Sequence, residues 1–283
     1  ASLNKTNSYQ FPSKIVTEII QLFTSTLISL GNTDKCRQFL TMATENLIDT
    51  DIIDLIFQIT EYGLFLNCDE LSSACLDFAS ALLNVLPDRV WSFLGRSSIL
   101  GRNGQQSSFS TVLGSKEIVD GRYDLTLSTL KLIKSLIDSS VHTILDSKVS
   151  TQVKSDVVAR FTSHTVMIFE SLSYWAYSDS RQKIAISYEC LSIFTNLLHY
   201  SFDIDEVSCL ESKVTSQLAP ATIYLTNQFL APERVITRAL KPLLGAIETS
   251  ALSITSLDSD YPLSSDETIL IYSVLAVSSE LVK

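Results

Sequence analysis

The chain has 283 residues, of which 46% are hydrophobic and 18% charged, so it has room for a large core and its composition argues against disorder over most of its length. Glycine and proline are scarce, with 8 and 6 residues, which favours long helices over a fold of many strands and turns. The formal net charge is −10 and the basic residues are scattered, so the chain lacks the cationic surface that nucleic-acid binding needs.

The cysteines indicate a reducing compartment. They are odd in number, form no CxxC pair and sit among apolar neighbours, which is typical of buried thiols in a cytosolic or nuclear protein. No signal peptide is recognisable, and the most membrane-like run, around residues 269–277, is far too short to span a bilayer. We therefore expect a soluble protein without membrane insertion. The cysteines are Cys36, Cys68, Cys75, Cys190 and Cys209.

Apolar residues recur at helical spacing through the first third of the chain. A helix is predicted to end at Gly31-Asn32, a second to begin at Asp34, a third to run from Asp51 to Tyr62, and a fourth to cover 69–86. A short helix is expected to follow with Pro87 in its first turn. The stripe of the first helix contains Val16, Ile19, Ile20, Phe23, Leu27 and Leu30.

Residues 95–121 interrupt this pattern. They hold five of the eight glycines and a run rich in serine and glutamine, which predicts a long surface loop or an inserted segment. The chain is thereby divided into an N-terminal helical stack at 1–94, the insertion at 95–121 and a C-terminal helical stack at 122–283.

Helical spacing resumes in the second half, with helices expected at 123–146, 150–177, 180–201, 204–230 and 232–256 and a last one from Ser264. Several lack a fully polar face, as helices packed between two neighbours do. The predicted fold is all-α, an irregular HEAT-like α-solenoid of stacked antiparallel helix pairs. Its last helix is still apolar at "SVLAVSSELVK", which predicts a fragment of a longer protein.

Motifs of catalysis and of metal or cofactor binding are not recognisable. The histidines His142, His164 and His199 lie far apart and have no cysteine at ligand spacing. The acidic run at 258–267 lacks the central glycine of a calcium loop, and the glycines of 95–121 form no phosphate-binding motif. Asp51 and Asp54 stand where they would cap a helix. We predict no enzyme activity, no metal and no cofactor.

The stretch "SYWAYSDSRQKIAISYECL", residues 173–191, allows two interpretations. Its aromatic and basic residues could stack on and neutralise single-stranded nucleic acid, or they could form a corner between two packed helices. Trp175 and Tyr188 fall on stripes that face the core, whereas Arg181 lies between the helices. The corner is therefore preferred, with Trp175, Tyr177, Arg181 and Tyr188 as its structural residues.

This corner also carries a family resemblance. The stretch "FESLSYWAYSDSRQKIAISYECLSIFTNLL" resembles the large α-solenoid scaffold nucleoporins of the nuclear pore's inner ring, in which a Trp- or Tyr-containing corner is followed by an Arg and another apolar helix. "LPDRVWSFLGRSSILG" at 86–101 and "YDLTLSTLKLIKSLI" at 123–137 look similar to the segments that flank a variable loop in those proteins.

The resemblance implies a non-enzymatic scaffold of the nuclear pore complex at the nuclear envelope, which supports protein and mRNA transport. The implied partners are other nucleoporins, above all short helical segments of linker nucleoporins. A karyopherin-like soluble transport receptor or HEAT-type adaptor is the main alternative, and an all-helical enzyme or regulatory subunit is the third. The charge distribution, rather than the resemblance, indicates a candidate partner-binding surface at the insertion and its basic rims, with the alternative that the insertion is solvated and dispensable. Its residues are Arg96, Arg102, Phe109, Lys116 and Arg122.

Overall fold

The computed structural model describes residues 13–45, 47, 50–97, 117–138, 147–202 and 218–226, together with residues 245, 247, 272 and 276. Every regular element in these ranges is a helix, which confirms the predicted all-α class. The elements are α1 (Ser13–Leu30), α2 (Thr33–Glu45), α3 (Ile52–Phe65), α4 (Asp69–Leu83), α5 (Pro87–Arg96), α7 (Glu117–Asp120), α8 (Asp124–Asp138), α10 (Thr151–Ser171), η2 (Leu172–Tyr174) and α11 (Ser180–Phe202).

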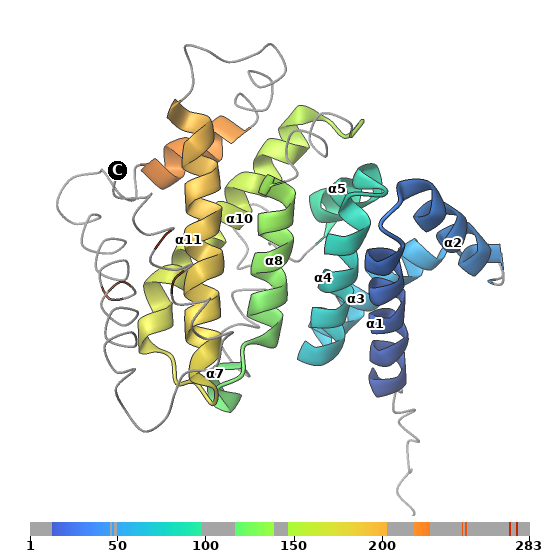
Figure 1. Ribbon diagram of the computed structural model, residues 1–283, viewed down its shortest axis with the longest axis horizontal. Coiled ribbons are helices and arrows are strands. Elements are labelled where there is room, and N and C mark those ends of the chain that lie inside the picture. Colours follow the sequence, from blue (N-terminus) through green and yellow to red (C-terminus); the bar gives the residue numbers. More distant parts are fainter. Residues whose placement is uncertain are drawn as a thin grey trace, which may run out of the picture.

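The helices form two layers, as expected of a solenoid. Helices α1, α4, α8 and α11 stand side by side in that order, each packed on the next (Figure 1). Helices α3, α5 and α10 lie behind this row, with α3 and α5 packed on α4, and α10 on α5, α8 and α11. Helix α4 therefore has α1 on one side and α8 on the other, while its rear face lies on the second layer.

Local signals explain where the helices begin and end. Gly31 ends α1 with a φ of +57°, and the Asn32 side chain accepts hydrogen bonds from Asp34 N at 2.9 Å and Lys35 N at 3.1 Å, so Asn32 rather than Asp34 caps α2. The predicted cap of α3 is confirmed, because Asp51 Oδ1 accepts from Ile53 N at 2.9 Å.

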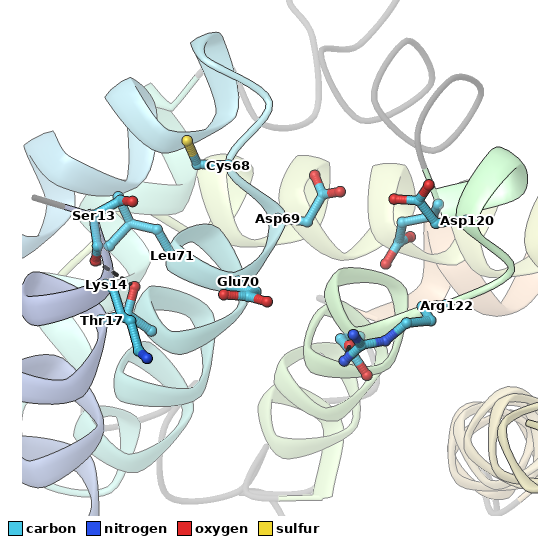
Figure 2. A pocket seen from close by; sticks show the side chains of 11 residues that line it. Ser13, Lys14, Thr17, Cys68, Asp69, Glu70, Leu71, Asp120 and Arg122 are labelled. Atoms are coloured by element: carbon cyan, nitrogen blue, oxygen red, sulfur yellow. Dashed lines mark hydrogen bonds and ion pairs between the residues drawn. The ribbon is translucent and has the colours of Figure 1, made fainter. Parts of the chain in front are cut away.

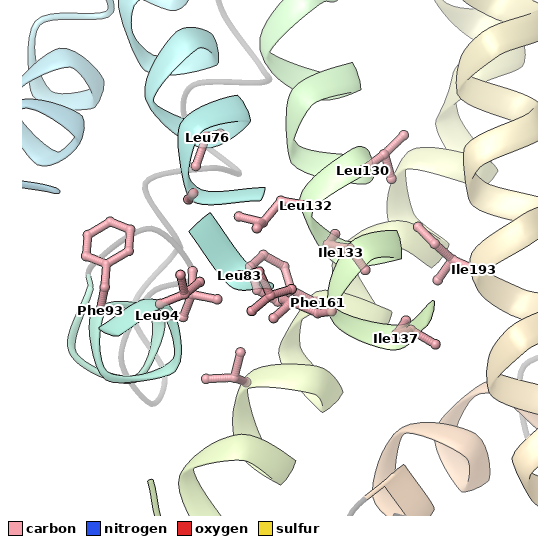
Figure 3. Close-up of a cluster of buried hydrophobic side chains, with 14 of the residues drawn as sticks. Leu76, Leu83, Phe93, Leu94, Leu130, Leu132, Ile133, Ile137, Phe161 and Ile193 are labelled. Carbon is pink, nitrogen blue, oxygen red and sulfur yellow. The ribbon is translucent and has the colours of Figure 1, made fainter. Parts of the chain in front are cut away.

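The core runs continuously through both layers. Large side chains of α4, α5, α8, α10 and α11 meet in one cluster, and their hydrophobic burial is the main stabilising contribution (Figure 3). Phe57 and Phe93 stack in parallel with ring centroids 4.1 Å apart, which joins α3 to α5. Fully buried members include Leu76, Leu83, Leu94, Leu130, Leu132, Ile133, Ile137, Phe161 and Ile193.

Some predicted core residues are exposed. Ile19 has 48% of its surface accessible and Tyr62 has 46%, although both fall on apolar stripes. The buried face of α1 is instead completed by Thr17 and Thr24, whose hydroxyls donate to the carbonyls of Ser13 at 2.8 Å and Ile20 at 2.9 Å and so bury no unpaired donor.

Two predicted boundaries were wrong in detail. The helix expected to reach residue 177 ends at Ser171, because η2 follows and Trp175 has extended backbone with ψ of 145°. The predicted loop at 95–121 has helical ends, since Gly95 and Arg96 belong to α5 and Glu117–Asp120 form α7. Residues 98–116 lie outside the described ranges, and the division into 1–94, 95–121 and 122–283 stays a prediction. The helices expected at 204–230, at 232–256 and from Ser264 lie mostly outside these ranges as well.

Candidate functional site

The aromatic corner is built around Tyr123, which is 1% exposed and precedes α8. Its ring stacks on Trp175 with centroids 4.8 Å apart and planes 8° apart, and it meets Tyr177 at 4.9 Å and 47°. The Tyr123 hydroxyl donates to the Ala176 carbonyl at 2.9 Å, and the Tyr177 hydroxyl donates to the Leu172 carbonyl at 2.8 Å. Tyr123 therefore occupies a ring face of Trp175 that a nucleobase would need.

The two other predicted corner residues lie apart from this stack. Arg181 is exposed and forms an ion pair with Asp179 at 2.9 Å, and hydrogen bonds from the Arg181 side chain and backbone lower the pKa of that carboxyl. Asp179 Oδ1 also accepts from Arg181 N at 3.0 Å, which caps α11. Tyr188 is half-buried, and Lys134 Nζ lies 4.6 Å from its ring centre while pairing with Glu189 at 3.2 Å.

The turn before α8 is fixed to the corner by hydrogen bonds. Ser178 N donates to the Gly121 carbonyl at 2.8 Å, and Ser178 Oγ donates to the Asp120 carbonyl at 2.8 Å. The Gln182 side chain accepts from Tyr123 N at 3.0 Å. Gly121 has a φ of +67°, and a Cβ there would lie 2.8 Å from Ser178 Oγ and 3.0 Å from Ser178 N. Only glycine fits this turn without strain.

Glu117 is a buried carboxyl that caps α8 from inside the fold. Its Oε1 accepts from Leu125 N at 2.8 Å and Thr126 N at 3.3 Å, and its Oε2 accepts from the Thr126 hydroxyl at 2.6 Å. The side chain is 2% exposed, and burial raises the pKa of Glu117 to about 7 despite these hydrogen bonds. The carboxyl thus satisfies backbone N–H groups at the start of a helix that is packed on both sides.

A polar groove follows the outer face of α4, between α1 and α8. It consists of three adjoining hollows of about 290, 440 and 560 Å³. The first and second hollows share Glu70 and Arg122, and the second and third share Asp77 and Lys131. Figure 2 shows the first hollow, with Lys14 on α1 at one side and Arg122 at the other. The stretch of α1 that borders the groove, Lys14 to Ile28, corresponds to about 20 Å of helix.

The predicted partner-binding residues are divided by the fold. Arg96 ends α5, is exposed and donates from Nε to the Ser92 carbonyl at 3.0 Å. Arg122 follows α7, pairs with Asp124 at 3.1 Å and borders the groove. In Figure 1, α5 lies on the upper side of the helix stack and α7 on its lower side, so the helix that ends at Arg96 and the helix that precedes Arg122 are far apart. The remaining three, Arg102, Phe109 and Lys116, lie outside the described residues.

Within the described ranges, His, Cys, Asp and Glu side chains form no group of three that could hold a metal ion. Over the same part of the chain, no helix is both long and apolar enough to cross a membrane. Cys36, Cys75 and Cys190 are buried free thiols and Cys68 is half-buried, whereas Cys209 lies outside these ranges. Burial raises the pKa of the Cys75 thiol to about 12, so this sulfur is unreactive at neutral pH.

Sequence reasoning missed the residues that hold these surfaces together. Glu117 and Gly121 fall within the predicted insertion and Tyr123 follows shortly after it. In space, Gly121 and Tyr123 contact residues 175–182, and Glu117 contacts the start of α8. A signal existed for Gly121 alone, since a glycine directly before a helix-forming run marks a turn. The groove acids on α1 and α4 gave none, because they look like the ordinary polar face of each helix.

Comparison with known proteins gives one consistent result. The family model of the N-terminal subdomain III of nucleoporin Nup188 matches residues 2–283. Nucleoporin NUP188 of Saccharomyces cerevisiae is 28% identical over 251 residues, which is 80% of this chain and 15% of that protein. Nucleoporin NUP188 of Chaetomium thermophilum is 24% identical over 62% of this chain, and nucleoporin nup184 of Schizosaccharomyces pombe is 25% identical over 74%. The chain spans about a tenth to a seventh of the length of these relatives.

The two-layered stack of helices is that of an α-solenoid scaffold domain. The chain belongs to the Nup188 family of nucleoporins, in which it corresponds to N-terminal subdomain III. This confirms the nucleoporin resemblance, and it makes the chain a part of a nuclear pore component at the nuclear envelope. The family is a structural one rather than a family of enzymes.

Proposed function

We propose that this chain is a structural module that binds other nucleoporins and thereby supports nucleocytoplasmic transport. The observation that carries the proposal is the family match over residues 2–283. The continuous core and the hydrogen-bonded corner support it, because a scaffold must present its surfaces at fixed positions.

The partners we propose are short segments of linker nucleoporins. Grooves between helices are suited to such segments, which bind along a preformed surface without requiring a large rearrangement of the scaffold. The two ends of the 95–121 segment, Arg96 at one and Arg122 at the other, are separate candidate contacts, because loops on a rigid stack often carry binding residues. We propose that the chain does not bind nucleic acid directly.

An affinity capture from nuclear-envelope extract, read by mass spectrometry, tests this function. A second sample carries added GTP-bound transport GTPase. We expect recovery of other nucleoporins in both samples, unchanged by the GTPase. Recovery of soluble cargo that the GTPase releases, without nucleoporins, would instead indicate a transport receptor. A variant with residues 98–116 replaced by a Gly/Ser linker of the same length tests this segment, and we expect it to recover less of at least one partner.

A further inference from the structure

The groove between α1 and α8 has α4 as its floor. Ser73, Ser80 and Ala81 are small side chains on this floor, whereas Glu70 and Asp77 of the same helix place carboxylates along it. A chain lying lengthwise in the groove could therefore approach α4 between these two acids while its side chains reach both walls. The groove is open to solvent along the row of helices seen in Figure 1.

The groove carries an excess of negative charge. Two of its basic residues are already paired, Arg122 with Asp124 and Lys134 with Glu189, which leaves Lys14 and Lys131 against the remaining acids. The acids that border the three hollows are Glu18, Asp69, Glu70, Asp77, Glu117, Asp120, Asp124, Asp138 and Glu189, and the bases are Lys14, Arg122, Lys131 and Lys134.

Only some of the acids that border the groove are explained by their position at the start of a helix. Asp69, Glu70 and Asp124 lie in first turns, where a carboxylate is favoured by the helix dipole. Glu18 lies beyond the first turn of α1, and Asp77 lies in the middle of α4, where burial raises the pKa of its carboxyl although Ser128 and Lys131 act to lower it. A helix start accounts for neither acid, and further cations placed beside them would be attracted to the groove.

We propose that the groove over α4 binds a short segment of a partner protein that is rich in lysine or arginine. The inference rests on the proposed function and names the chemistry of one partner. Lysine and arginine suit this surface because their long apolar stems can lie along the groove while the charged ends reach acids on both walls. Nucleic acid is excluded as an occupant because its phosphates would face these carboxylates.

The test uses a pair of charge reversals and a matched control pair. Glu18→Lys with Glu70→Lys reverses two exposed acids of the groove, one on the α1 wall and one in the first turn of α4. Glu45→Lys with Asp156→Lys reverses two exposed acids on α2 and α10, away from the groove, and changes the net charge of the chain by the same amount. Any effect of overall charge is then equal in the two variants. Melting temperatures and circular dichroism show whether each variant is folded.

The probe is a fluorescent peptide in which lysine and alanine residues alternate. The control peptide has glutamate at every lysine position. We expect the lysine peptide to bind the parent chain and the control variant alike, and to bind the groove variant about tenfold more weakly, with a difference that shrinks at high salt. Equal affinities of both variants, or no binding of the lysine peptide to the parent chain, would overturn the proposal.

The capture of nucleoporins separates this inference from the function on which it rests. If the parent chain recovers nucleoporins but the peptide does not distinguish the two variants, the groove assignment fails and the scaffold function stands. If the peptide distinguishes the variants but nucleoporins are not recovered, the groove binds basic segments and the proposed function fails.

Discussion

The aromatic corner and the groove lie on two sides of the same short stretch, Gly121 to Asp124, but they are built in opposite ways. At the corner, Tyr123 is stacked, buried and hydrogen-bonded to residues 175–182. Toward the groove, the exposed Arg122 pairs with the half-buried Asp124, whose Oδ1 also accepts from Gln182 Nε2 at 2.9 Å. The start of α8 is thus anchored on one side by directional contacts, so that its other side can present charges at fixed positions.

This contrast predicts that substitutions at the corner change stability, whereas substitutions in the groove change binding. The corner and the helix starts beside it supply four stability predictions, given from the largest expected effect to the smallest. Each has a companion variant that separates one physical contribution from another.

Tyr123→Ala removes a fully buried aromatic ring and the stacking partner of Trp175. We expect the free energy of unfolding, measured with denaturant, to fall by about 3 to 4 kcal/mol. Tyr123→Phe keeps the ring and loses only the hydrogen bond to the Ala176 carbonyl, and should cost about 1 kcal/mol. If both variants had the same small effect, the corner would not be a stabilising centre.

Glu117 gives the stability a pH dependence. Its pKa of about 7 in the folded chain lies above the ordinary value of 4.5, so the folded state holds the proton more tightly. The contribution is complete below pH 4.5 and is lost as the pH rises through 7, by up to about 3 kcal/mol at about 1.4 kcal/mol per pKa unit.

Glu117→Gln is the control for this titration. The buried His164, whose pKa is lowered to about 4, works in the opposite direction, because stability falls as the pH drops from 6.5 toward 4. The difference between the unfolding free energies of parent and Glu117→Gln cancels that contribution, and it should change steadily from pH 4.5 to 7.5. A flat difference would contradict the raised pKa of Glu117.

Gly121→Ala adds a Cβ at a φ of +67° and 2.8 Å from Ser178 Oγ, so strain and a steric clash combine. We expect a loss of about 2 kcal/mol in the free energy of unfolding. Gly31→Ala has a similar φ of +57° but meets nothing within 4 Å, and should lose only about 1 kcal/mol. Equal losses at the two positions would mean that the contact with Ser178 adjusts freely.

The smallest effects are expected at the exposed start of α11. Asp179→Ala removes the cap on Arg181 N. It should lower the free energy of unfolding by about 1 kcal/mol, which is measured as a slightly lower melting temperature. Arg181→Ala keeps the cap but removes the exposed ion pair with Asp179, and it should change stability by less than about 0.5 kcal/mol. Because Asp179→Ala removes the ion pair as well as the cap, a larger effect of Arg181→Ala would show that Arg181 stabilises this corner through contacts other than that with Asp179.

Helix positions could be predicted from the sequence because their signals are local. Asp51, Pro87 and the Gly31-Asn32 stop each act within one turn of the chain, and the structure has helix boundaries at all three. Burial was predicted less well on α1, where Ile19 is exposed and Thr17 is buried, because an apolar stripe does not reveal which of its edges meets a neighbour.

The contacts of the candidate sites could not be predicted, because they depend on tertiary packing. Tyr123 contacts Trp175, which is 52 positions further along the chain, and Glu117 caps a helix that begins seven residues after it. The groove arises where Glu18, Glu70 and Asp77 come together from two helices, with small residues between them. In type and spacing, the three groove acids are the same as the acids on the polar face of an ordinary surface helix.

The most direct test is the nucleoporin capture repeated with the two charge-reversal variants. A scaffold that binds basic partner segments over α4 should recover nucleoporins with the parent chain and with Glu45→Lys/Asp156→Lys. At least one of these partners should be lost or strongly depleted with Glu18→Lys/Glu70→Lys. Equal recovery of every nucleoporin by all three chains would contradict the account.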